Sequence, residues 1–368
     1  MPATRVLVVD DAVVVRRIVT DALSADRSLE VVGTAPNGRI ALSKIPQLNP
    51  DIVTLDVEMP EMDGLATLVE LRRSYPSLPV IMFSTLTERG TKVTMDALLK
   101  GANDYVTKPA NVGSVAEAMQ RIRVELVPKI HALCGTPKIA SGPVPHPAST
   151  ASPVRTTGRR APQNPIQVVV IGVSTGGPNA LSDLLPTIPA DLGVPVLIVQ
   201  HMPHMFTALL AERLDARSPL RVSEAAPGQR VRRGDVLVAP GDRHLEVRRE
   251  GTQVVADITK DPPENSCRPA ADVLFRTAVR AYRGGVLGVV LTGMGFDGRR
   301  GAQEINEAGG WVIAQDRASS VVWGMPGGVV EAGVADEVHP LAELGPRITA
   351  LVDGRGRTVT GHAAEVAR

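Results

Sequence analysis

Residues 167–178 read QVVVIGVSTGGP, an apolar β-branched run that ends in a serine, two glycines and a proline. Such a run predicts a strand that is buried on both faces, as in parallel sheets. Gly176 and Gly177 allow a sharp turn, and Pro178 suits the first turn of a following helix. Ser174 is therefore predicted to project beside a helix N-terminus, where free backbone N–H groups favour an anion.

Two later segments repeat this pattern of an apolar strand followed by a polar residue. VPVLIVQ (194–200) leads to His201, and GGVLGVVLTG (284–293) leads to a glycine-rich loop that holds Asp297. The carboxyl ends of parallel strands meet at one edge of a sheet, and neighbouring strands lie roughly 5 Å apart. We therefore predict a nucleophile (Ser174), a general base (His201) and a carboxylate that orients the base (Asp297).

Each of these segments also has a simpler interpretation. STGGP is similar to a truncated phosphate-binding loop, although it lacks the lysine ending and the glycine spacing of nucleotide sites. A single histidine at a strand end is more often structural, and His204 is a nearby alternative to His201. An aspartate before glycine is usually a turn residue. The three residues taken together favour the catalytic interpretation.

The first part of the chain alternates strand-like runs with helical patterns such as VVVRRIVTDALS and LATLVELRRS. Five such strands alternating with helices over about 125 residues predict an α/β domain with a doubly wound parallel sheet. The predicted strands are RVLVVD (5–10), EVVG (30–33), DIVTLDV (51–57), PVIMFST (79–85) and DYVTK (104–108).

Acidic residues gather at the carboxyl ends of these strands. Asp10 and Asp11 follow the first strand, and Asp56 ends the third. Carboxylates at one edge repel each other unless they share a hard cation, and Mg²⁺ takes such oxygen ligands together with phosphate. Ser84 offers a hydroxyl, and Lys108 offers an ammonium group to a phosphoryl oxygen. The simpler alternative is that the aspartates cap the next helix and Lys108 is a solvated loop residue.

Composition divides the chain into parts. Residues 126–164 are rich in Pro, Ser, Thr and Gly, which predicts a flexible linker between a domain at 1–125 and a domain at 165–352. A polar tail follows at 353–368. The second domain again alternates strands and helices and is predicted to have a doubly wound, Rossmann-like parallel sheet. Within it, DVLVAPGDRHLEVRREGTQVVADI (235–258) has closely spaced turn signals that predict an antiparallel β insertion.

The bulk composition is typical of a globular protein. The 368 residues carry a net charge of +1, so no nucleic-acid or anionic-membrane partner is indicated. Few aromatic residues are present to stack on bases. Cys134 and Cys267 form no disulfide or metal motif and are expected to be structural or incidental. No apolar run approaches the ~20 residues of a membrane span, so we expect a cytoplasmic protein without membrane insertion.

Four motifs occur in order in the first domain: DD (10–11), DVEMPEMDG (56–64), ST (84–85) and KP (108–109). Together they resemble the flavodoxin-like receiver domain of two-component response regulators. The resemblance implies that Asp56 accepts a phosphoryl group from a sensor histidine kinase. It also implies a Mg²⁺ site made by Asp11, Asp56 and the backbone carbonyl of Glu58, with Asp10 acting through water. The implied switch and phosphate-contacting residues are Ser84, Tyr105 and Lys108.

Five motifs of the second domain carry a further resemblance: GVSTGGP, QHMP, APGDRHL, RPAADVLF and LTGMGFDG. They resemble the catalytic domain of the chemotaxis protein-glutamate methylesterases. The resemblance implies the triad named above, backbone near Met294 in the oxyanion hole, support from Thr175, and no cofactor at this site. Two positions depart from the family pattern. Phe296 stands where a small or polar residue is expected, and Ala271 stands where serine is commoner.

The family implies hydrolysis of glutamate γ-methyl esters on methyl-accepting chemotaxis receptors, with release of methanol, and deamidation of receptor glutamines. We expect the unphosphorylated receiver to cover the catalytic cleft and phosphorylation of Asp56 to relieve this inhibition. Three alternatives remain: the same serine chemistry on another signalling protein, an inactive docking module, and a DNA-binding regulator. The last is disfavoured because no helix-turn-helix pattern with a basic face follows the linker.

Overall fold

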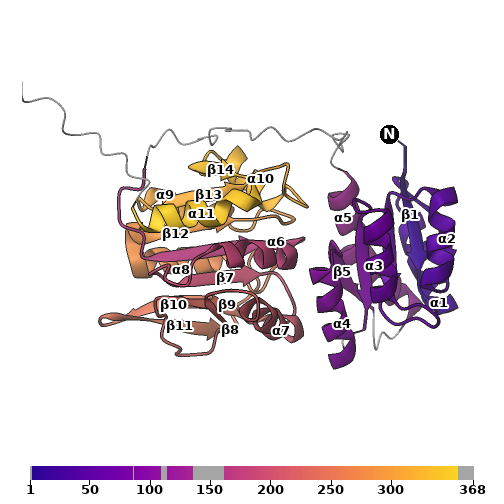
Figure 1. Ribbon diagram of the computed structural model, residues 1–368, viewed down its shortest axis with the longest axis horizontal. Helices are drawn as coiled ribbons and strands as arrows, with labels where there is room; N and C mark the ends of the chain where they lie inside the picture. The colour runs from indigo at the N-terminus through magenta and orange to yellow at the C-terminus, as the bar shows by residue number, and fades with distance from the viewer. Residues whose placement is uncertain (1, 86, 109–113, 136–160, 355–368) are drawn as a thin grey trace, which may run out of the picture. The chain divides into compact units, whose positions relative to one another are not determined.

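A computed structural model describes residues 2–85, 87–108, 114–135 and 161–354. The chain divides into two compact units, residues 1–149 and residues 150–368, each built on its own sheet (Figure 1). We call them the receiver unit and the catalytic unit. Within the described ranges, no helix is long and apolar enough to cross a membrane.

The receiver unit is a five-stranded parallel sheet with the order β2-β1-β3-β4-β5. Helices α1 and α5 pack against each other, and α3 lies between α2 and α4. The strands are β1 (Thr4–Val9), β2 (Leu29–Ala35), β3 (Ile52–Asp56), β4 (Val80–Ser84) and β5 (Asp104–Thr107). The helices are α1 (Val13–Ser24), α2 (Gly38–Leu48), α3 (Gly64–Ser74), α4 (Glu88–Leu99) and α5 (Val115–Cys134).

Local chemistry sets where four of these helices begin. The residue before each of these helices has a side chain that accepts a hydrogen bond from the backbone N–H group three residues further on. These capping residues are Asn37, Asp63, Thr87 and Ser114. Such caps satisfy donors that have no partner inside the helix. The strand order reverses between β1 and β3, and this reversal is where open α/β sheets bind ligands.

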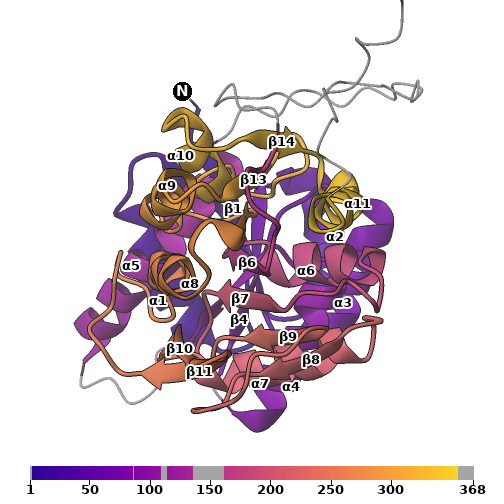
Figure 2. The same cartoon turned by 90° about the vertical axis from the view of Figure 1, so that its left-hand side faces the viewer.

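The catalytic unit has a seven-stranded parallel sheet with the order β14-β13-β12-β6-β7-β9-β8. Figure 2 shows α8 and α9 on one face of this sheet and α6 and α11 on the other. The strands are β6 (Val168–Val173), β7 (Val196–Gln200), β8 (Arg221–Glu224), β9 (Asp235–Val238), β12 (Val286–Val290), β13 (Trp311–Gln315) and β14 (Glu337–His339). The helices are α6 (Gly177–Leu184), α7 (His204–Asp215), α8 (Ala271–Tyr282), α9 (Arg299–Glu307), α10 (Met325–Glu331) and α11 (Leu341–Val352), with 3₁₀ turns η1 (Leu185–Thr187) and η2 (Arg283–Gly285).

Helices cover both faces of this sheet, which explains why the central strands are apolar along their whole length. Every residue of β6, β7, β12 and β13 is buried, and Trp311 at the start of β13 is fully enclosed. These two parallel sheets confirm the predicted fold class of two doubly wound α/β domains. As in the receiver unit, the strand order reverses beside the first strand, here between β6 and β12.

The predicted antiparallel insertion is smaller than expected. Only β10 (His244–Glu250) and β11 (Gln253–Thr259) pair antiparallel, as a separate hairpin. The first part of the predicted insertion, β9, joins the main sheet in parallel between β7 and β8. Its residues 236–238 are fully buried, whereas β10 and β11 keep exposed positions. Burial on both faces, and not the nearby turn signals, decides the pairing of β9.

The predicted end of the first domain at residue 125 is too early. It falls inside α5, which continues to Cys134 because Leu126 and Ile130 extend its buried face by one more turn each. The predicted linker therefore begins after this helix. Its residues 136–160 lie outside the described part of the chain, as do residues 355–368 of the predicted tail.

Candidate active site and phosphoacceptor site

Ser174 is the first residue after β6, at the carboxyl edge of the sheet. Its backbone N–H donates to the carbonyl of Thr292 (3.0 Å), and its own carbonyl accepts from Gly177 N–H (2.8 Å). The turn needs glycine at position 176, where φ is 79° and a Cβ would lie 2.7 Å from the Val321 side chain. Helix α6 starts immediately afterwards, so Ser174 projects beside a helix N-terminus as predicted.

His201 is brought next to Ser174 by the register of two strands. Val173 at the end of β6 pairs with Gln200 at the end of β7, so the following residues are neighbours at the sheet edge. The backbone N–H of His201 continues this ladder by donating to Val173 (3.2 Å). The alternative base, His204, is exposed at the start of α7. The structure therefore places His201 at the sheet edge beside Ser174.

Asp297 holds the imidazole from the third strand end. Its Oδ2 lies 2.8 Å from His201 Nε2, and its side chain is 2% exposed. Backbone N–H groups at the start of α8 donate to the same carboxylate, from Ala271 at 2.6 Å and Asp272 at 3.1 Å. Gly298 N–H adds a further donor at 3.0 Å. The carboxylate is therefore oriented by a helix N-terminus as well as by the loop that carries it.

Burial and hydrogen bonding act in opposite directions on this pair. Burial alone lowers the pKa of His201, but hydrogen bonds to Asp297 and Cys267 outweigh it and raise the pKa to about 10. Burial alone raises the pKa of Asp297, yet the hydrogen bond and charge of His201 hold it below its ordinary value. The pair therefore favours the imidazolium–carboxylate form at rest.

The hydroxyl of Ser174 is not yet engaged. Within the described ranges, no hydrogen bond joins Ser174 Oγ to the imidazole. Such contacts are often long without substrate and shorten when it binds. Asp297 contacts Nε2 of His201, and Cys267 is a second partner of the same ring.

The predicted oxyanion and support residues lie in adjoining loops. Met294 follows β12 by four residues, and its backbone N–H makes no hydrogen bond among the described residues. A free N–H is what an oxyanion donor requires. The carbonyl of Thr175 accepts a hydrogen bond from Thr292 Oγ1 (3.0 Å), which ties the nucleophile loop to the end of β12.

The acidic residues of the receiver unit also meet at a sheet edge. Carboxylate oxygens of Asp10, Asp11 and Asp56 all lie within 4.8 Å of one another. Lys108 Nζ lies 2.8 Å from both Asp10 Oδ2 and Asp56 Oδ2. Burial raises the pKa of Asp56 to about 6 against the opposing effect of Lys108. The three clustered carboxylates suit a divalent cation such as Mg²⁺ in both charge and ligand type. The ammonium group of Lys108 suits a phosphoryl oxygen instead.

The remaining receiver residues surround this cluster. Ser84 is buried at the end of β4, and its backbone carbonyl accepts from Lys108 N–H (2.7 Å). Tyr105 is 8% exposed, with Lys129 Nζ 5.2 Å from its ring centre. Glu58 N–H donates weakly to Asp56 Oδ1 (3.4 Å), and Glu58 lines an open cavity of about 530 Å³ beside Asp11.

Comparison with known proteins gives these two sites a context. Residues 169–348 match the family model of the CheB methylesterases, and residues 6–120 match that of the response regulator receiver domain. A protein-glutamate methylesterase/protein-glutamine glutaminase of Nocardioides sp. is 55% identical over 353 residues, which cover 95% of each chain. The chain belongs to the CheB family.

Two further CheB proteins support this assignment. The protein-glutamate methylesterase/protein-glutamine glutaminase of Trichodesmium erythraeum is 52% identical over 95% of this chain and 99% of its own. The CheB methylesterase catalytic domain of Thermotoga maritima, a crystal structure, is 42% identical and matches with a TM-score of 0.50 over 51% of this chain and 100% of its own. These matches confirm that the chain combines a receiver domain with a CheB methylesterase domain, as its motifs predicted.

Sequence reasoning missed two polar residues of this candidate site. Gln200 Nε2 donates to the carbonyls of Ser174 (3.0 Å) and His201 (3.3 Å), so one amide holds both catalytic loops. Asn265 Nδ2 donates to Asp297 (2.8 Å) and to the buried Asp272 (2.9 Å). Position 200 was visible inside the QHMP motif, whereas no sequence signal marked Asn265, because tertiary folding brings it to Asp297.

The two departures from the family pattern have different consequences. Ala271 is fully buried and serves Asp297 through its backbone N–H, which serine would supply equally. Phe296 is 60% exposed at the rim of the site. Cys267, which was expected to be structural or incidental, contacts the imidazole of His201.

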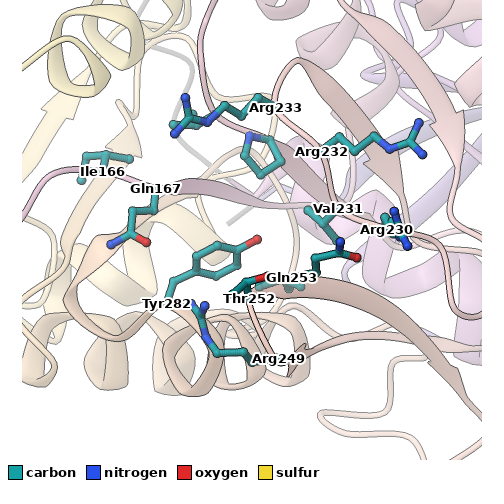
Figure 3. Close-up of a pocket in the computed structure, with 13 residues that line it drawn as sticks. Ile166, Gln167, Arg230, Val231, Arg232, Arg233, Arg249, Thr252, Gln253 and Tyr282 are labelled. Atoms are coloured by element: carbon teal, nitrogen blue, oxygen red, sulfur yellow. The ribbon is translucent and has the colours of Figure 1, made fainter.

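A cavity of about 450 Å³ lies at the other edge of the catalytic sheet, where Gln167 and Pro195 precede β6 and β7 (Figure 3). Tyr282 lies in its middle, and several arginines line it. Figure 3 shows Arg232 and Arg233 pointing in different directions, so their guanidinium groups do not converge on one point. The cavity is separate from Ser174, His201 and Asp297, which lie at the carboxyl edge of the sheet.

Proposed function

We propose that this protein hydrolyses glutamate γ-methyl esters on methyl-accepting chemotaxis receptors and deamidates receptor glutamines, acting in the cytoplasm. The observation that carries the proposal is the His201–Asp297 hydrogen bond of 2.8 Å beside Ser174 at the sheet edge. The relatives named protein-glutamate methylesterase/protein-glutamine glutaminase support the choice of substrate.

The geometry supports acyl transfer through the serine. Neutral His201 takes the hydroxyl proton of Ser174 while the serine Oγ attacks the ester carbonyl. The backbone N–H of Met294 stabilises the oxyanion that forms. The imidazolium then gives its proton to the departing methoxide, so methanol leaves and an acyl-serine remains. Water then attacks the acyl carbonyl as His201 takes one of its protons. The imidazolium returns this proton to Ser174 Oγ as the acyl bond breaks, which releases the glutamate carboxylate and restores the serine. With glutamine the same steps release ammonia.

Regulation is proposed to come from the receiver unit. Asp56 would accept a phosphoryl group from a sensor histidine kinase, with Mg²⁺ held by Asp11, Asp56 and the Glu58 carbonyl and assisted by Asp10. The cation would neutralise charge between the carboxylates and the incoming phosphoryl oxygens. Lys108 would then contact the phosphoryl group, and Ser84 and Tyr105 would change position as its switch residues. Relief of inhibition requires that the receiver bind the catalytic unit differently in its two states.

The test is incubation of the full chain with a methylated receptor fragment, with and without a small phosphodonor, followed by mass spectrometry of individual glutamates. We expect loss of methyl groups, faster with the phosphodonor. Ser174→Ala should abolish the loss, whereas Ser223→Ala, an exposed serine of β8, should not. Unchanged methylation with the native chain, or full activity of Ser174→Ala, would contradict the proposal. Loss of methyl groups from another signalling protein only would assign the same chemistry to a different substrate.

A further inference from the structure

An exposed aromatic ring stands beside the catalytic carboxylate. Phe296 is 60% exposed, and the other strongly exposed large hydrophobic residues in the described part of the chain are four valines of the receiver unit. Phe296 directly precedes Asp297, the partner of His201. The ring therefore belongs to the same loop as Met294 and Asp297, which follows β12.

The ring is held in position before a partner arrives. The backbone after it is fixed by the buried Asp297, whose carboxylate receives the hydrogen bonds described above. One edge of the ring lies against the first turn of α10, because a Cβ on Gly328 would be 3.1 Å from Phe296 Cδ1. The guanidinium carbon of Arg299 lies 5.3 Å from the ring centre. A prefixed aromatic residue loses little conformational entropy when it is covered.

Positive charge accompanies the ring. Arg299 and Arg300 are exposed in the first turn of α9, and neither forms an ion pair with a described residue. Glu264, whose carboxylate feels the charge of Arg300, is already bound by Arg276 at 2.7 Å. Both arginines are therefore exposed without an ion pair among the described residues, and Arg299 lies against the Phe296 ring. Aromatic and arginine side chains together are typical of binding hot spots.

We propose that Phe296, Arg299 and Arg300 form a docking surface for an amphipathic helix of the substrate protein, the helix that carries the target glutamate. This inference rests on the proposed function. On a helix, residues three or four positions apart lie on the same face, about 5–6 Å apart. An apolar residue at such a position would cover Phe296 while the esterified glutamate reaches Ser174. Acidic residues on the flank, which the reaction itself creates, would face Arg299 and Arg300.

The test compares two substrates of the full chain: a methylated helical receptor fragment and the small ester N-acetyl-glutamate γ-methyl ester. Phe296→Ala is expected to raise KM for the helical fragment about tenfold and to leave kcat/KM for the small ester within about twofold. Phe296→Leu should restore most of the affinity. Arg300→Glu should also raise KM for the fragment, with an effect that shrinks at high salt. The controls are Val124→Ala and Arg280→Glu, exposed residues on α5 and α8.

The outcomes separate the two proposals. If the native chain cleaves neither substrate, the proposed function fails. If it cleaves both and Phe296→Ala leaves KM for the fragment unchanged, the docking surface fails while the esterase stands. An equal loss on both substrates would also overturn the docking role, because it would mean that the ring only supports the catalytic loop.

Discussion

At the scale of single residues, Asp297 is more constrained than His201, the proposed base that it contacts. Asp297 receives hydrogen bonds from His201, Asn265 and backbone N–H groups at 2.6–3.1 Å. His201 has one carboxylate partner and a side chain that is 13% exposed. Asp297 thus fixes the imidazole on one side, while Cys267 is a second partner of the ring.

The raised pKa of His201 has a kinetic consequence. The base must be neutral to accept a proton from Ser174, so kcat/KM for a small methyl ester should rise as pH increases toward the pKa of about 10. Asp297→Asn removes the charge that raises this pKa. The rising limb should then move toward the ordinary histidine range, and the maximal rate should fall roughly 10³–10⁴-fold. A native profile that levels off near pH 6.5 would contradict this prediction.

Gln200 offers a test of positioning. Gln200→Glu keeps the shape of the side chain but replaces the amide donor that binds the carbonyls of Ser174 and His201. We expect kcat to fall roughly tenfold or more with little change in KM, because the two reacting groups lose their alignment while the docking surface is untouched. Steady-state kinetics on the receptor fragment give both constants. A change in KM alone would show that Gln200 acts on binding.

At the scale of elements, the last strand is held by buried charge. Glu337 of β14 is fully buried, and Arg347 of α11 donates to both of its oxygens at 2.6 Å, with His339 Nε2 at 2.8 Å. Burial alone raises the pKa of Glu337, but His339 and Arg347 outweigh it and lower the pKa to about 2. This ion pair joins the edge strand of the sheet to the helix that follows it.

Loss of this pair should destabilise the catalytic unit. Glu337→Gln leaves Arg347 without its buried partner, and the free energy of unfolding in urea should fall by about 3 kcal/mol at pH 7. Because the folded pKa is depressed from 4.5, the contribution is present above pH 4.5 and lost as pH falls toward 2. The mutant and native proteins should therefore converge in acid. Glu343→Gln, at a side chain 56% exposed, should change stability by less than about 1 kcal/mol.

The same elements show what a sequence can reveal. The central strands were predictable because both of their faces are covered, which leaves apolar runs such as residues 168–173. The pairing of β9 and the end of α5 were not, because each depends on which neighbours cover a short segment. Among the candidate residues, those at strand ends were found from parallel-sheet geometry. Asn265 could not be found in this way, since its loop reaches Asp297 only through tertiary folding.

At the scale of the whole molecule, each unit carries its site at the reversal of its own strand order. Asp10 and Asp56 flank the β1–β3 boundary, and Ser174 and Asp297 flank the β6–β12 boundary. In both units, the candidate site therefore lies where open α/β sheets bind ligands. One site holds a proposed phosphoryl acceptor and the other a proposed acyl acceptor.

Separate sites predict separable mutants. Asp56→Asn should abolish stimulation by a small phosphodonor while leaving the unstimulated rate on a small methyl ester within about twofold. Ser174→Ala should accept phosphate normally and hydrolyse nothing. Phosphoprotein gel analysis and ester kinetics on the same preparations distinguish the two losses. Stimulation that persists in Asp56→Asn would place the acceptor elsewhere.

The distribution of tryptophan provides an optical probe for these experiments. Both tryptophans of the chain, Trp311 and Trp323, belong to the catalytic unit. Trp311 is enclosed in β13, whereas Trp323 is partly exposed and bridges to Gly293, next to the loop that bears Asp297. Tryptophan fluorescence, excited in the indole absorption band, therefore reports on the catalytic unit alone. Melting of the receiver would be silent at that wavelength, and ligand entry near Ser174 would register chiefly through one chromophore.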